Sequence, residues 1–118
     1  MNLNESTIQV GSRTFRANLA ELENAVVAFL FEGRVRLGTI AIAIPGIGEV
    51  AAGRSSVLVG GKYTMTTRAL AEKLAGKTGK ISLVSLFTEL DEAEALPIYA
   101  GLLDKIALSN SGAKIPAQ

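Results

Sequence analysis

Apolar and polar residues alternate over the first part of the chain, as in Ile8-Gln9-Val10 and again over residues 15–19. Such alternation places every second side chain on the same face of an extended chain. The pattern from residue 8 to residue 19 therefore predicts a half-buried strand or a bent pair of strands.

Two longer apolar runs follow, at residues 25–32 (AVVAFLFE) and 35–44 (VRLGTIAIAI). Both have the length and the β-branched or aromatic content that are typical of strands. Gly33 lies between them, so the two runs are predicted to pair as a hairpin with charged residues at its tip. Pro45 ends the second run and begins a glycine-rich loop over residues 45–54.

A short strand is expected at residues 55–60, and a helix follows it. One of the nearby threonines, Thr64, Thr66 or Thr67, is expected to cap this helix, because hydroxyl side chains satisfy the free N–H groups of a first turn. The helix is expected to end near a glycine, Gly76 or Gly79.

Another strand is expected at residues 80–87, and a second helix after it. Pro97 fits the first turn of a helix and no later position, so this helix is expected to begin near Leu96. The order is strands, helix, strand, helix. It predicts an α+β fold in which two helices lie on one face of a mostly antiparallel sheet of about five or six strands.

The strands at residues 25–31 and 39–44 are apolar on both faces, with isoleucines on one side of the second strand and alanines on the other. A sheet whose second face meets water shows polar residues there. Either the hairpin is sandwiched inside the monomer or the second face meets another chain, and two helices are too few to cover both faces. We therefore expect a dimer interface on the second face, formed by Val27, Phe29, Ile40, Ile42 and Ile44.

The amino-acid composition excludes several classes of function. The 118 residues are 48% hydrophobic and suffice for a single domain over residues 1–118, with an ordered core over about 7–108 and a loose tail over 109–118. The chain has no cysteine and no histidine, which excludes disulfides, thiol nucleophiles and imidazole catalysis. A formal net charge of +1 and 5% aromatic residues give no basis for nucleic-acid binding. With neither a leader pattern nor an apolar membrane-spanning segment in the sequence, we expect a cytoplasmic protein.

No motif forms a catalytic group or a cofactor site. Residues 46–51 match the glycine pattern of a dinucleotide fold, but the next strand begins too soon for the helix that such a site requires. Residues 60–62 lack the further glycine of a phosphate-binding loop. The four carboxylates within residues 89–94 are better explained by the start of a helix than by a metal. We therefore expect no enzyme activity, no cofactor and no metal.

Arginines gather in the strand-rich half, where they either contact an anionic partner or protect strand edges. We expect the partner surface to combine the hairpin tip with the 45–54 loop. Its residues are Arg34, Arg36, Ile47, Glu49 and Arg54. The alternative function is a regulatory domain that binds a small molecule or an anion through that loop.

From Ser55 onward the chain combines the strand segment Leu58-Val59-Gly60, a polar loop, a helix rich in leucine, alanine and lysine, and a Val-Ser strand. This stretch resembles the third and fourth proteasome assembly chaperones, small α+β proteins that share one fold. The likeness to the fourth is greatest at residues 70–78 (LAEKLAGKT), and the likeness to the third at residues 38–42 (GTIAI) and in the final helix. The order of elements agrees over residues 7–108.

The resemblance implies a non-enzymatic dimer that binds a proteasome α subunit and helps the α-ring to assemble. Members of the family from eukaryotes work as a pair of different chains. Likeness to both members implies a homodimer of one ancestral-type chain, as expected of an archaeal relative, while a heterodimer with a related chain remains the alternative. The glycine-rich 45–54 loop has no counterpart in the family, so the resemblance assigns no binding residue.

Overall fold

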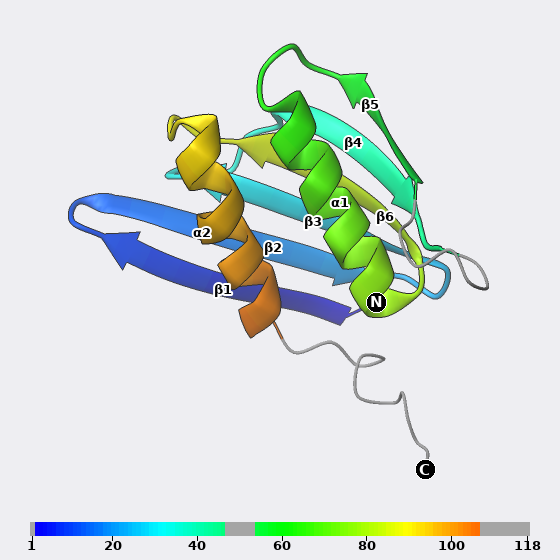
Figure 1. Ribbon diagram of the computed structural model, residues 1–118. Coiled ribbons are helices and arrows are strands. Elements are labelled where there is room, and N and C mark those ends of the chain that lie inside the picture. Colours follow the sequence, from blue (N-terminus) through cyan, green and yellow to red (C-terminus); the bar gives the residue numbers. More distant parts are fainter. Residues whose placement is uncertain (1, 47–53, 107–118) are drawn as a thin grey trace.

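The computed structural model describes residues 2–46 and 54–106, which form one mixed sheet with two helices on one face (Figure 1). Six strands lie in the spatial order β1-β2-β3-β6-β4-β5. The strands are β1 (Asn2–Val10), β2 (Arg13–Glu21), β3 (Ala25–Glu32), β4 (Thr39–Ile44), β5 (Arg54–Val59) and β6 (Ile81–Phe87). The helices are α1 (Thr64–Thr78) and α2 (Glu92–Lys105). The expected α+β fold and element order are confirmed.

The alternating pattern near the N-terminus forms a hairpin of two long strands, β1 and β2. Val10 pairs with Arg13, so only two residues make the turn. Gly11, the first of them, has φ 62°, a left-handed conformation that suits glycine at this position of a two-residue hairpin turn.

The prediction of a hairpin around Gly33 is wrong. Strand β6 lies between β3 and β4, parallel to the first and antiparallel to the second. Residues 33–38 therefore cross the C-terminal end of β6, so that β4 lies on the other side of β6 from β3 in the same sheet. A glycine between two apolar runs signals a reversal of the chain, but it does not reveal whether a distant strand will enter between them.

The core lies between the sheet and the helices. Alternate residues of the central strands, such as Val26, Ala28 and Val84, are fully buried beneath Leu70 and Leu74 of α1. The ring of Tyr99 from α2 meets that of Phe15 edge to face, with ring centres 6.1 Å apart. No helix in the described parts of the chain is long and apolar enough to cross a membrane.

The start of α1 differs from the prediction, because no threonine side chain caps it. The residue before the helix is Tyr63, whose φ is 61°. Its hydroxyl donates to the carbonyl of Leu90. At the other end α1 runs past Gly76 and stops at Gly79, which is left-handed and donates its N–H to the Ala75 carbonyl.

The helix α2 begins at Glu92, four residues before the predicted start, so Pro97 lies inside it. The Glu92 carboxylate accepts hydrogen bonds from the backbone N–H and the hydroxyl of Thr66 at 3.2 and 3.1 Å. This contact with the first turn of α1 fixes the first turn of α2. A hydrogen bond to a charged group contributes about 1.5–3 kcal/mol, which offsets much of the cost of an internal proline.

Candidate functional site

The face of the sheet opposite the helices, here called the open face, has no covering layer among the described residues (Figure 1). The register aligns side chains in rows across this face. One row crosses all six strands and is apolar except at its last position. Its members are Leu3, Ala20, Val27, Leu83, Ile42 and Ser56.

Large apolar side chains on the open face reach solvent. Leu3 is 75% exposed, and Ile44 and Ile81 are 43% and 40% exposed. Val27, Phe29, Ile40 and Ile42 lie farther in and are partly exposed. The five residues predicted for a dimer interface thus lie on one continuous surface, although the predicted hairpin does not exist, because β6 adds Leu83 between β3 and β4.

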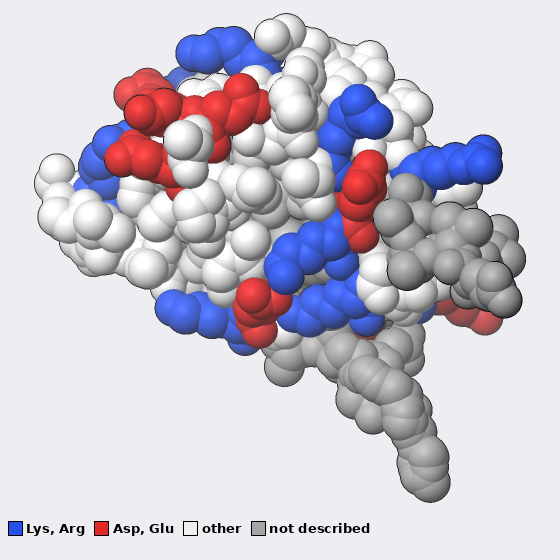
Figure 2. Space-filling model, viewed as in Figure 1, with Lys and Arg blue, Asp and Glu red and all other residues white. Residues whose placement is uncertain are grey.

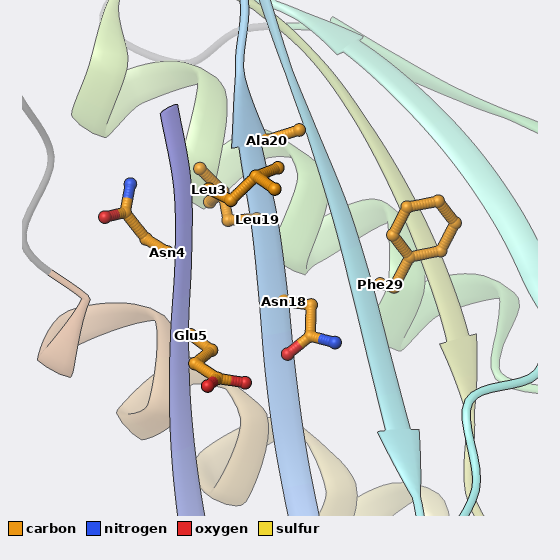
Figure 3. A pocket seen from close by; sticks show the side chains of 7 residues that line it. All are labelled: Leu3, Asn4, Glu5, Asn18, Leu19, Ala20 and Phe29. Atoms are coloured by element: carbon orange, nitrogen blue, oxygen red, sulfur yellow. The ribbon is translucent and has the colours of Figure 1, made fainter. Parts of the chain in front are cut away.

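The β1–β2 side of the open face is more polar, because Glu5 and Asn18 face each other there. A hollow of about 360 Å³ lies over these strands, with the small side chain of Ala20 in it and Phe29 at its far wall (Figure 3). The Asn18 Oδ1 is buried and accepts no hydrogen bond from a described residue. The open face therefore carries an acceptor beside its apolar surface.

The 33–38 segment lies at the rim of the open face. The guanidinium of Arg36 stands 4.9 Å from the centre of the Phe87 ring, and Phe87 is aligned with Phe31 on this face. Arg34 is exposed in the same segment. Residues 33–38 form no strand, since the strand predicted at 35–44 begins only at Thr39, so Arg34 and Arg36 do not lie at the tip of a hairpin.

Arg54 opens β5 opposite Ile44, at the edge of the open face. The other two predicted partner residues, Ile47 and Glu49, lie outside the described residues, as does most of the loop that the anion-binding alternative requires. Arg36 and Arg54 lie at opposite ends of the open face, because Arg36 stands over Phe87 at the last residue of β6 and Arg54 pairs with Ile44 beyond Ser82, near the first residue of β6. The described residues therefore do not bring the two arginines together into one partner surface.

A second arrangement joins three parts of the fold through Glu32. Its carboxylate takes two hydrogen bonds from Arg13, at 2.7 and 3.1 Å, and one each at 2.9 Å from the Thr88 hydroxyl and the Glu89 backbone N–H. These donors, above all Arg13, lower the pKa of Glu32 to about 2. No pattern in the sequence indicates this cluster, because its members are distant in the chain and match no motif.

The acid–base chemistry of these groups is unfavourable for catalysis. Glu32 is too weak a base near neutral pH, and burial raises the pKa of Tyr99 to about 12 and raises that of Tyr63 as well. In the described part of the chain no three acidic residues are placed to hold a metal ion.

The chain matches no protein-family model, and no curated protein matches it.

Proposed function

We propose that this protein is a non-enzymatic binding module that dimerises through the open face and acts as a proteasome assembly chaperone. The open face carries the proposal. It presents a continuous apolar surface over the central strands, from Val27 through Leu83 to Ile42. Monomeric proteins rarely leave a large apolar patch in contact with water.

The size of the open face suits a second copy. Strands are spaced by about 4.8 Å and rise about 3.3 Å per residue, so six strands of this length present roughly 500–700 Å² per copy. Two copies then bury roughly 1,000–1,400 Å², close to the lower limit of about 1,200 Å² for stable, specific interfaces. A symmetric pair also covers the same surface on both chains without a further partner.

Charges around the open face fit a partner bound at its rim. Arg36 lies at one end of that rim with Arg34 exposed in the same segment, and Arg54 lies at the opposite end. Guanidinium groups bind carboxylates through two parallel hydrogen bonds. We take the partner to be a proteasome α subunit, on the strength of the resemblance of residues 38–42 and 70–78, and place the complex in the cytoplasm.

Two measurements test the proposal. Sedimentation equilibrium of the purified protein at tens of micromolar is expected to give the mass of a dimer, and a monomer at that concentration contradicts the dimer. The protein is then mixed with purified α subunits and passed over a sizing column. Co-elution supports the chaperone role, whereas a dimer that binds no α subunit contradicts that role and leaves the dimer standing.

A further inference from the structure

The edge strand β1 is long and poorly protected. It pairs only with β2, spans nine residues, and carries a single charged residue, Glu5, with no proline. Exposed edge strands offer free N–H and C=O groups, and proteins protect them with charges, prolines, bulges or short length. Apart from Glu5, β1 has none of these features.

The opposite edge is protected. Strand β5 has six residues and begins with Arg54. Its pairing with β4 is irregular between Ile40 and Ala41. Helix α1 also holds it, through hydrogen bonds between the Ser55 hydroxyl and the side chains of Arg68 and Glu72. The two edges therefore differ, and β1 is the one that can accept another strand.

The turn geometry identifies the free backbone groups of β1. Residues that flank a two-residue hairpin turn form a hydrogen-bonded pair, so Val10 bonds with Arg13 and every second residue of β1 faces β2. The N–H of Gly33 donates to the Thr14 carbonyl at 3.0 Å, which confirms that Thr14 faces β3. The outward groups of β1 are those of Leu3, Glu5, Thr7 and Gln9.

An apolar groove lies beside the last residues of β1. It has a volume of about 480 Å³ and runs between the β1–β2 hairpin and α2. Val10 lines it on the helix side of the sheet and is 51% exposed, and Ala93, Pro97 and Ile98 of α2 line it as well. A strand added to β1 would direct its helix-side residues toward this groove, since side chains alternate between the faces of a sheet.

The groove also carries a backbone carbonyl and a carboxylate, and these favour an occupant with positively charged side chains. Pro97 has no backbone N–H, so it gives no hydrogen bond to the Ala93 carbonyl four residues earlier. Glu94 lies in the groove wall. Acidic side chains gather at the N-terminal end of α2 (Figure 2), whereas the nearby Arg13 is paired with Glu32 at 2.7 Å. An occupant with cationic donors fits this surface.

We propose that β1 and this groove form a docking site for an extended basic segment of another protein. The segment adds to the sheet as a further strand beside β1, over about seven residues, and places one apolar side chain against Val10 and Pro97. Its lysine or arginine side chains meet Glu94. Recognition thus combines backbone pairing with one side-chain pocket, the usual division of roles in strand addition. The site uses the outer backbone edge of β1 and the helix side of the sheet, and it does not depend on dimerisation.

The probe is a blocked eight-residue peptide of alternating threonine and leucine with a lysine at each end. A twin peptide carries glutamates at its ends, and a second twin carries a central proline. Amide exchange is followed by nuclear magnetic resonance at physiological salt. The amides of Leu3, Glu5, Thr7 and Gln9 are expected to exchange fast in the free protein and at least tenfold more slowly with the lysine peptide, while neither twin protects them.

Two variants test the two parts of the site. Thr7→Pro removes one outward N–H, which an edge strand tolerates, and is expected to lower the affinity for the lysine peptide at least tenfold. Glu94→Lys is expected to lower that affinity at least threefold and to allow the glutamate peptide to bind. The matched control, Glu23→Lys, makes the same charge change in the turn between β2 and β3 and is expected to leave both affinities unchanged. Thermal melting checks that each variant folds.

The results separate the possible occupants. Protection of the outward amides together with the Glu94 charge preference supports the proposal. Equal binding of all three peptides, or no protection at millimolar peptide, overturns it. If the outward amides are protected in the free protein and Thr7→Pro lowers the sedimentation mass, a second copy occupies the edge, and this also overturns the proposal. If Thr7→Pro does not fold, the affinities of Glu94→Lys for the lysine and glutamate peptides test the proposal.

Discussion

Arg13 and Glu32 form a two-pronged ion pair across the antiparallel strands β2 and β3, with Nε to Oε2 at 2.7 Å and the second contact at 3.1 Å. The same carboxylate accepts hydrogen bonds from the hydroxyl of Thr88 and the backbone N–H of Glu89, two residues that follow directly after β6. Glu32 thereby ties the N-terminal meander to the connection that leads into α2. This cluster positions α2, which lines the proposed docking groove.

The Glu32 cluster predicts a loss of stability in acid. The pKa of Glu32 is lowered from 4.5 to about 2, first of all by the hydrogen bonds from Arg13. A carboxyl whose pKa is lower in the folded state stabilises the fold above its unfolded pKa, and the effect is lost as the pH falls. The contribution of Glu32 is therefore expected to be complete above about pH 5 and to fade between pH 4.5 and 2.

Urea unfolding of the wild type and of Glu32→Gln at a series of pH values measures this effect. The variant is expected to be less stable by about 1.5–3 kcal/mol at pH 7, the usual value of a hydrogen bond to a charged group, and the difference is expected to shrink below pH 4. Glu23→Gln, an exposed change in a turn, is the control and is expected to match the wild type at every pH. A difference between wild type and Glu32→Gln that does not vary with pH would contradict the role of the ionised carboxylate.

Two glycines are expected to respond in opposite directions to alanine. A Cβ on Gly38 would lie 2.0 Å from the Leu86 carbonyl oxygen, where 33–38 crosses the end of β6. The backbone must shift to make room for the Cβ, so Gly38→Ala is expected to destabilise the protein by about 1–3 kcal/mol. Gly76 lies inside α1, and an added Cβ would meet no atom within 4 Å apart from its chain neighbours and the backbone of its own helix, so Gly76→Ala is expected to stabilise the protein by about 0.5–1 kcal/mol. Denaturant midpoints compare both variants, and a neutral Gly38→Ala would contradict the close crossing.

The dimer proposal predicts that a charge at the centre of the open face separates the copies. Ile42 lies in the row between Leu83 and Ser56, so Ile42→Lys would bury an unpaired ammonium in the interface. The variant is expected to sediment as a folded monomer. Met65→Lys is the matched control, since Met65 is 77% exposed on α1, on the other side of the sheet. A variant Ile42→Lys that remains a dimer would place the interface elsewhere.

Local patterns in the sequence predicted two helices, about five or six strands and the order of these elements, because the alternation of apolar residues and the helical spacing indicate which side of each element is buried. They failed where a distant segment decides the outcome. Strand β6 enters between β3 and β4 through backbone pairing, and nothing near Gly33 reports it. The start of α2 moved from Leu96 to Glu92, where a carboxylate meets the first turn of α1.

The candidate site was predictable only in part, for the same reason. The double-sided apolarity of residues 25–31 and 39–44 indicated an uncovered face, and the structure places Val27, Phe29, Ile40, Ile42 and Ile44 on it. The Arg13–Glu32 cluster and the groove beside Val10 arise from residues far apart in the chain. No spacing rule connects them, so only the tertiary arrangement reveals them.

The last prediction concerns the basic residues that are proposed to bind an α subunit. Arg34 and Arg36 lie in the 33–38 segment at the rim of the open face, with Arg36 over the Phe87 ring. In the described residues neither arginine forms an ion pair within the chain, so their charges are available to a partner. Reversing both, as Arg34→Glu with Arg36→Glu, is expected to weaken α-subunit binding more than tenfold, above about 1.4 kcal/mol.

The matched comparison is Lys73→Glu with Lys77→Glu on α1. Lys73 already pairs with Asp104 at 2.9 Å, and Lys77 donates to the Leu103 carbonyl at 2.8 Å, so these charges act within the chain and are expected to matter less for the partner. Fluorescence titration with a labelled α subunit measures both double variants, and sedimentation confirms that each remains a dimer. Because Arg36 covers part of Phe87, Arg34→Glu alone separates a loss of partner contact from a disturbed rim. If the lysine variant binds more weakly than the arginine variant, the partner occupies the helix side of the molecule.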